Sequence, residues 1–91
     1  MATIKEKEFE KVLKALANRR RLAVVGYLKR HQNVAITDIA AHIDLSVKAT
    51  SKHVSLLAAV GIVEKEQVSK LMLASLAHNL PRISRPIIAL L

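Results

Sequence analysis

The chain has 91 residues, a length that suits one domain and is too short for two independent ones. It has no cysteine, which excludes disulfides, thiolate metal sites and cysteine nucleophiles, and Phe9 and Tyr27 are its only aromatic residues although 52% of the chain is hydrophobic. Lysine and arginine number 15 against 7 acidic residues, and this charge of +8 predicts a polyanionic partner, the alternative being that it only keeps the protein soluble.

Two helices are expected at the start of the chain. Over residues 4–17, Ile4, Phe9 and Val12 recur at helical spacing among lysines and glutamates, which predicts a helix with one apolar face. Asn18 is a favoured N-cap for a second helix, which is expected to end at the cations of residues 29–31.

A short strand and two further helices are expected in the middle of the chain. Residues 34–36 predict an edge strand, and Thr37 is expected to cap a helix over residues 38–43. After a turn at 44–45, Ser46 is expected to cap a helix that runs to about residue 59 and is closed by Gly61. In that helix, positions 50, 54 and 57 share an inward face, whereas 47, 48, 51, 52 and 55 share the opposite face.

The last third of the chain predicts a hairpin and a final helix. Two antiparallel strands are expected around a turn at residues 69–70, followed by a helix over 79–91 with Pro81 in its first turn and a kink or restart at Pro86. The resulting order, α-α-(β)-α-α-β-β-α, predicts a mainly α fold of the α+β class with a small β-hairpin. This is the winged helix-turn-helix plan, here as a single domain over residues 1–91.

Three segments carry a family resemblance. Residues 13–22 (LKALANRRRL), 36–46 (ITDIAAHIDLS) and 51–57 (SKHVSLL) with 60–63 (VGIV) resemble motifs of the ArsR/SmtB-type winged helix-turn-helix transcriptional repressors, and the likeness covers about residues 9–80. It implies that helix 46–59 binds DNA and that Arg21 fixes the start of its helix through hydrogen bonds, with phosphate contact as the alternative. For Arg19 and Arg20, phosphate contact and a structural role in the helix are both left open. Thr50 stands where the family usually has an aliphatic residue and is expected to be half-buried.

The exposed face of helix 46–59 is small, polar and lysine-bearing, which suits entry into a major groove about 12 Å wide, although an ordinary solvated face is the alternative. Lys48 and Lys52 are expected to reach guanine edges or phosphates, and Ser46, Ser51 and the helix N-terminus are expected to hold phosphate oxygens. The hairpin turn lacks the family glycine, and two glutamates dilute its charge, so only a modest contact is expected from the wing. The expected DNA-binding residues are Ser46, Val47, Lys48, Ser51, Lys52, His53, Ser55, Lys65, Lys70 and Thr37.

Metal sensing and catalysis find little support in the sequence. The four histidines are scattered, none forms an i, i+3 or i, i+4 pair, and the helix over 38–43 has no cysteine, so the chain resembles a family member without the cysteine metal-sensing motif. A metal site would require ligands from both subunits of a dimer. Neither a glycine-rich loop nor a Ser, His and acid grouping is present, so we expect no enzyme, no cofactor and no catalytic or metal-binding residue.

The expected helices 4–17 and 79–91 carry more apolar residues than a single winged-helix domain can bury in its own core. In the resembling family the first and last helices pack against a second subunit, which implies a homodimer with recognition helices about 34 Å apart. The alternative is a tail that binds a different protein. The expected dimerisation residues are Ile4, Phe9, Val12, Ile83, Ile87, Ile88, Leu90 and Leu91.

Together these features predict a sequence-specific double-stranded DNA-binding transcriptional regulator that acts as a repressor, with an unidentified effector. Two alternatives remain: an architectural DNA-binding protein with low sequence specificity, and a protein-interaction module on a winged-helix scaffold. The first alternative rests on the absence of Asn, Gln and Arg from the recognition face, since these residues read bases directly. No run approaches the roughly 20 apolar residues of a membrane span. The charged segment 1–6 does not resemble a signal peptide, so we expect a cytoplasmic protein without a membrane partner.

Overall fold

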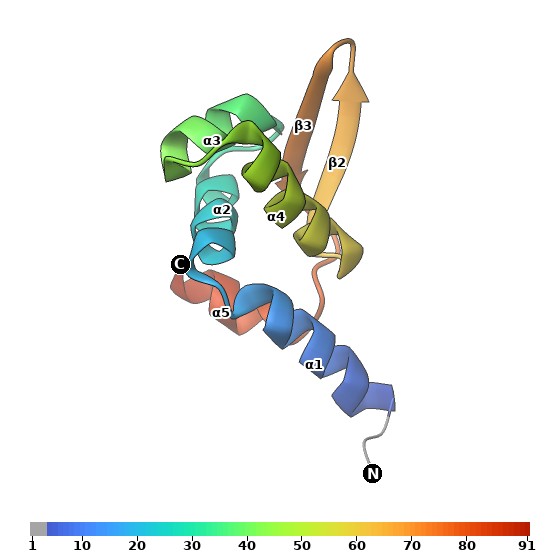
Figure 1. Cartoon of the computed structure of the whole chain (residues 1–91). Helices are drawn as coiled ribbons and strands as arrows, with labels where there is room; N and C mark the ends of the chain where they lie inside the picture. Colours follow the sequence, from blue (N-terminus) through green and yellow to red (C-terminus); the bar gives the residue numbers. More distant parts are fainter. Residues whose placement is uncertain (1–3) are drawn as a thin grey trace.

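The structure is a computed structural model that describes residues 4–91. Its elements are, in chain order, α1 (Ile4–Leu16), α2 (Arg19–Arg30), β1 (Val34–Ala35), α3 (Ile36–Ile43), α4 (Val47–Ala59), β2 (Val63–Val68), β3 (Leu71–Leu76) and α5 (Ser84–Leu90) (Figure 1). This mainly helical α+β arrangement confirms the predicted fold class and the predicted order of elements.

The three strands form a small antiparallel sheet in the order β1-β3-β2. β2 and β3 pair from Val63 opposite Leu76 outward to the turn, and β1 adds two residues at the other edge, where Val34 lies opposite Ala74. The tip of the β2–β3 hairpin projects beyond the helices as a wing (Figure 1). Ser69 lies in the turn of this hairpin and has a left-handed backbone conformation, with φ of 55°. The turn lacks the glycine that the family usually has there.

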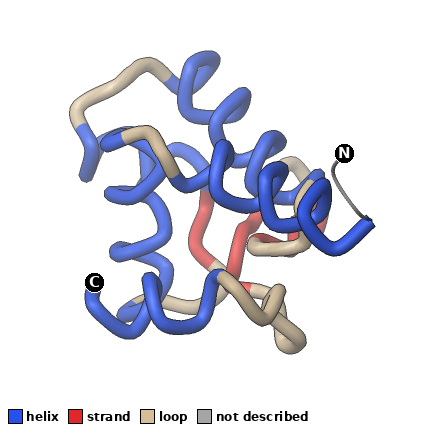
Figure 2. Tube along the Cα trace, turned by 90° about the horizontal axis from the view of Figure 1, so that it is seen from below, coloured by secondary structure: helices blue, strands red, loops and turns tan. Residues whose placement is uncertain are grey.

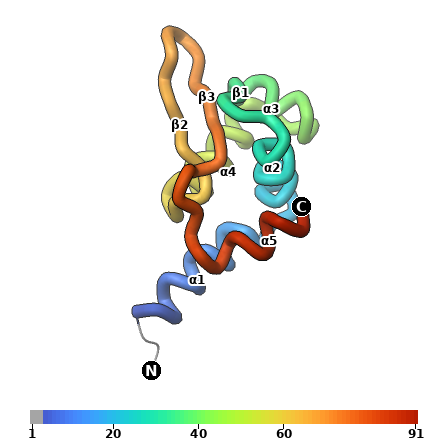
Figure 3. Tube along the Cα trace, turned by 180° about the vertical axis from the view of Figure 1, so that it is seen from behind, coloured from blue at the N-terminus to red at the C-terminus, as the bar shows by residue number. Residues whose placement is uncertain are grey.

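The core is aliphatic and lies between α2, α3, α4 and the base of the sheet, with α1 and α5 across the end opposite the wing tip (Figure 3). Seen from below, the helices enclose the strands at their base (Figure 2). None of the helices in residues 4–91 has the length and hydropathy of a membrane span. The core residues are Val12, Ala15, Leu16, Val24, Val25, Leu28, Ile36, Ile39, Ile43, Val54, Leu57, Ile62, Val63, Ala74 and Ile88.

Side-chain caps and left-handed residues set several boundaries as predicted. The Oδ1 atom of Asn18 accepts hydrogen bonds from the backbone N–H groups two and three residues on, at 2.9 and 3.1 Å, and starts α2. Ser46 Oγ accepts from the backbone N–H of Ala49 at 3.1 Å and starts α4. Gly61 follows α4 with φ of 80°, the conformation that costs glycine least.

α3 starts earlier than predicted, and the expectation that Thr37 caps it is wrong. The helix begins at Ile36 directly after β1, its N-cap residue is Ala35, and no side chain caps it. Ile36 and Ile39 are 6% and 0% exposed, so burial of the first turn in the core sets the start of this helix. Thr37 is exposed.

α5 starts later than predicted, at Ser84 rather than at residue 79. Pro81 precedes the helix, and its carbonyl accepts from the backbone N–H and the Oγ of Ser84 at 2.9 and 2.6 Å. Pro86 is the third residue of α5, where a backbone N–H has no acceptor within the helix. Pro86 therefore lies within the first turn of a helix that begins at Ser84, so the helix does not restart there, and the expectation that Pro81 occupies the first turn is wrong.

Candidate nucleic-acid interface

The two faces of α4 separate the core from solvent as the spacing predicted. Thr50, Val54 and Leu57 are 0% exposed and point inward, so Thr50 is fully buried rather than half-buried. Within residues 4–91 its Oγ1 has no hydrogen-bond partner. On the outer face, Lys48 and Lys52 are exposed, and α4 carries no acidic residue along its length. This face therefore presents positive charge without a competing carboxylate of its own.

The turn between α3 and α4 is held from both sides. Asp44 adopts φ of 56° and ends α3, and the backbone N–H of Leu45 donates to the carbonyl of Ala40 at 3.0 Å. From α2, Arg20 Nη1 donates to the carbonyl of Ile43 at 2.9 Å. Ile43 is the last residue of α3, so its carbonyl accepts no hydrogen bond within that helix. The bond from Arg20 therefore connects α2 to the turn between α3 and α4. The sequence left open whether Arg20 contacts phosphate or holds its helix in place. The structure shows a hydrogen bond of the second kind.

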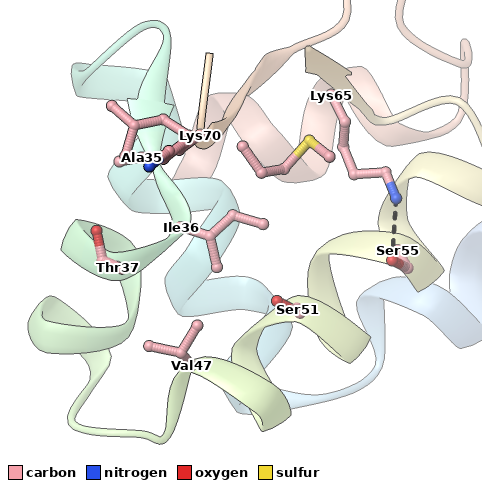
Figure 4. A pocket seen from close by; sticks show the side chains of 10 residues that line it. Ala35, Ile36, Thr37, Val47, Ser51, Ser55, Lys65 and Lys70 are labelled. Carbon is pink, nitrogen blue, oxygen red and sulfur yellow. Dashed lines mark hydrogen bonds between the residues drawn. The ribbon is translucent and has the colours of Figure 1, made fainter. Parts of the chain in front are cut away.

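A groove of about 330 Å³ separates α4 from the hairpin (Figure 4). Six of the ten expected DNA-binding residues line it, and they come from α3, α4 and the wing: Thr37, Val47, Ser51, Ser55, Lys65 and Lys70. Its remaining lining is Ala35, Ile36, Leu71 and Met72, so hydroxyl and ammonium groups stand over an apolar base. Lys65 Nζ donates to Ser55 Oγ at 3.1 Å and links the wing to α4 (Figure 4).

The glutamates of the wing lie away from this groove. Side chains of a strand alternate between its faces, so Glu64 and Glu66 lie on the face opposite Lys65. Glu64 Oε2 is 3.3 Å from Nδ1 of His78, in the segment after β3. These two carboxylates therefore do not line the groove, which composition alone could not show.

His53 lies on the other flank of α4, half-buried against α2. Its Nδ1 is 3.4 Å from Nη1 of Arg21, whose guanidinium also donates from Nε to the carbonyl of Ala15 at 2.5 Å and from Nη2 to that of Lys14 at 3.3 Å. Burial first, and then the charges of Arg21 and Arg20, lower the pKa of His53. A neutral imidazole accepts the Arg21 N–H, and Arg21 has the fixing role that the family resemblance implied.

The sequence profile described as "Bacterial regulatory protein, arsR family" matches residues 18–65, which is more than half of the chain. The chain belongs to this family. The matched segment runs from the N-cap of α2 into β2 and so contains the whole helix-turn-helix.

This arsR-family protein shares its fold with several solved structures. HlyU from Vibrio cholerae is 22% identical and superimposes with a TM-score of 0.82 over 98% of this chain and 92% of its own. The homodimeric winged helix-turn-helix DNA-binding domain of Mb0332 from Mycobacterium bovis is 25% identical, with a TM-score of 0.78 over 92% and 74%. The transcriptional repressor PagR of Bacillus anthracis is 22% identical, with a TM-score of 0.77 over 96% and 95%. No protein with curated annotation gives a significant sequence match.

Two of the histidines of this arsR-family protein contact the same tyrosine, and the other two lie elsewhere. The rings of His31 and His42 stand 4.4 and 4.3 Å from that of Tyr27, centroid to centroid. His53 contacts Arg21 and His78 contacts Glu64. Across residues 4–91, no three His, Asp or Glu side chains are grouped in a way that could hold a metal ion.

The expected dimerisation residues divide into three sets: buried, exposed and half-buried. Val12 and Ile88 are 7% and 5% exposed and belong to the core of their own chain, so they are not available to a second subunit. Ile4 and Leu90 are 77% and 88% exposed. Leu13, which the sequence did not single out, is 43% exposed and lines a shallow apolar hollow of α1.

The other four expected dimerisation residues are half-buried: Phe9, Ile83, Ile87 and Leu91. Phe9 lines the same hollow as Leu13, and Lys5 Nζ lies 5.6 Å from the centroid of its ring. These side chains keep part of their apolar surface open to a partner.

Proposed function

We propose that this arsR-family protein is a sequence-specific transcriptional repressor that binds double-stranded DNA as a homodimer, with α4 in the major groove. The observation that carries the proposal is the outer face of α4, which is capped by Ser46, bears Lys48 and Lys52 and has no acidic residue. A helix with this face at its surface has the shape and charge to enter a major groove.

The side chains of α4 divide into base-reading and phosphate-binding groups. Lys48 and Lys52 donate to O6 and N7 of guanine, which together present acceptors in the major groove. Val47, 46% exposed at the start of the helix, contacts the methyl group of thymine. Ser46, at the positive end of the helix, and Ser51, one turn further on, bind phosphate.

The groove between α4 and the wing accommodates the backbone strand that separates the major groove from the adjacent minor groove. The hydroxyls of Thr37 and Ser55, from α3 and α4, and the side chains of Lys65 and Lys70, from the wing, line it (Figure 4). These groups suit phosphate oxygens, and such contacts position a protein on DNA without reading its sequence.

Dimerisation is proposed through α1 and α5, whose exposed apolar residues Ile4, Leu13 and Leu90 lie outside the intramolecular core. The Mb0332 domain of similar structure is homodimeric, and PagR is a transcriptional repressor, which supports the same assembly and role here. A two-fold dimer presents one recognition helix to each half of a palindrome.

A second candidate function is architectural DNA binding with little sequence preference. It is favoured by one observation: the outer face of α4 has lysine, serine and valine but no Asn, Gln or Arg, the side chains that make bidentate contacts to bases.

A fluorescence anisotropy titration across salt concentrations tests both functions. The purified protein is titrated against a randomised duplex pool and against a duplex enriched from that pool by the protein. A preference of about a thousandfold or more for the enriched duplex supports the repressor. Equal affinities with a steep salt dependence support the architectural protein, and no binding at low salt refutes both.

A further inference from the structure

The two flanks of α4 are unlike each other. One flank faces the wing across the groove of Figure 4, where Lys65 and Lys70 stand. The other flank faces α1 across a hollow of about 280 Å³, and Lys11 and Lys14 of α1 line that hollow. Both of these lysines are exposed.

The hollow beside α1 is continuous with the outer face of α4. Leu56, which is 51% exposed, lines this hollow together with Lys11 and Lys14, and it also lines a shallow depression together with Lys52. One surface therefore leads from the proposed base-reading lysine of α4 to the two lysines of α1.

The position of α1 beside α4 is fixed by hydrogen bonds. Arg21 donates to the carbonyls of Lys14 and Ala15 in the last turn of α1 and contacts His53 of α4. One guanidinium thus joins α1, α2 and α4, and it holds the last turn of α1 in place next to the recognition helix.

Among residues 4–91, those that line this hollow include no carboxylate, although Glu10 lines the adjoining hollow of α1 together with Lys14. Over residues 4–91 neither Lys11 nor Lys14 forms an ion pair with a carboxylate. Between them the hollow is floored by small and apolar side chains, among them Ala59 and Leu56. Cations above an apolar floor match the phosphates and the deoxyribose faces of a nucleic acid backbone.

We propose that Lys11 and Lys14 bind the DNA phosphate backbone on the wall of the major groove opposite the wing. A helix in the major groove lies between two phosphate strands, so a flank without cations would leave one strand uncontacted. The wing lysines bind one strand and the α1 lysines bind the other. This inference rests on the proposed DNA binding and adds a second phosphate site to it.

The test uses Lys11→Gln, Lys14→Gln and the control Lys29→Gln, which removes the same charge from α2 at a site beside α5, where Lys29 Nζ contacts the carbonyl of Ala89. Binding to the enriched and random duplexes is measured across salt. Each phosphate contact contributes about 0.9 to the slope of log affinity against log salt, and each lysine occurs twice in a dimer. We expect Lys11→Gln and Lys14→Gln to lower the slope by about 2 each, to weaken both duplexes by the same factor, and to leave oligomeric state unchanged.

Two results overturn the proposal. One is a slope equal to that of Lys29→Gln. The other is a change in oligomeric state by sedimentation velocity, which would place the two lysines in the subunit interface. Failure of the proposed function is recognised separately, because the wild-type protein would then bind neither duplex.

Discussion

Nη1 of Arg21 and Nδ1 of His53 lie 3.4 Å apart, and this contact joins the start of α2 to the middle of the recognition helix. Arginine always donates, so Nδ1 must accept, and the imidazole has to be neutral for the contact to form. Burial and the two neighbouring arginines lower the pKa of His53 and favour that state.

This contact predicts a pH dependence of stability. The folded-state pKa of His53 lies below its ordinary value of 6.5, so between the two pKa values the unfolded chain binds more protons than the folded one. The stability contributed by the neutral form is present above about pH 6.5 and is lost as the pH falls towards the folded-state pKa. Denaturant unfolding at pH 7 and pH 5 should show a smaller loss for His53→Gln than for the wild type. Identical losses in the two proteins would contradict the assignment.

Thr50 predicts a stabilising substitution within the recognition helix. Its hydroxyl is fully buried without a partner, and valine has nearly the same shape without the polar atom. Thr50→Val should raise the free energy of unfolding by about 1 kcal/mol, or the melting temperature by about 4–8 °C, at fixed protein concentration. Thr37→Val, at an exposed position, is the matched control and should change stability little. Destabilisation by Thr50→Val would show that the hydroxyl has a partner.

Two substitutions of Ser46 should affect stability and DNA affinity differently. Ser46→Ala removes the acceptor of the Ala49 N–H and should lower stability by about 1 kcal/mol. Ser46→Asp keeps a good N-cap, so thermal melts should match the wild type, but its carboxylate faces the DNA phosphates. Anisotropy should then show affinity reduced on the order of tenfold or more by like-charge repulsion. Unchanged affinity in Ser46→Asp would place the start of α4 away from the backbone.

The outer face of α4 predicts two substitutions that reduce sequence discrimination. Lys48→Ala and Lys52→Ala should each reduce the preference for the enriched duplex over the random pool by about 1–3 kcal/mol, because each removes a donor to a base edge. Lys29→Ala, on α2, should leave that preference unchanged. If the lysines contact only phosphate, both duplexes will weaken equally and the base-reading role is refuted.

Substitution of the exposed leucines of α1 and α5 should prevent dimerisation. Leu13→Asp and Leu90→Asp place a carboxylate on the surface proposed to be buried between subunits, which should shift sedimentation velocity from dimer to monomer. Val68→Asp is the matched control, because Val68 is 42% exposed at the wing tip, and it should remain a dimer. A dimer that survives both leucine substitutions would place the interface elsewhere.

The local features of this protein could be read from its sequence. Asn18 and Ser46 cap their helices, Gly61 has positive φ, and positions 50, 54 and 57 of α4 point inward. Each of these depends on a few consecutive residues, through a side chain that bonds to its own helix or through the 3.6-residue period.

Other features were decided only by packing between segments distant in the sequence. Ile36 starts α3 because it is buried in the core, and Val12 faces that core whereas the adjacent Leu13 does not. The helical period fixes the angle between such neighbours, but only the position of the other helices decides which of them is covered.

The candidate interface shows the same division. The sequence by itself determined that α4 has a basic outer face, because the order and spacing of its residues define that face. Only the tertiary structure decided that Lys65 of the wing reaches Ser55 and that Lys14 of α1 lies at the other flank, since these contacts require Arg21 and the hairpin to bring remote segments together.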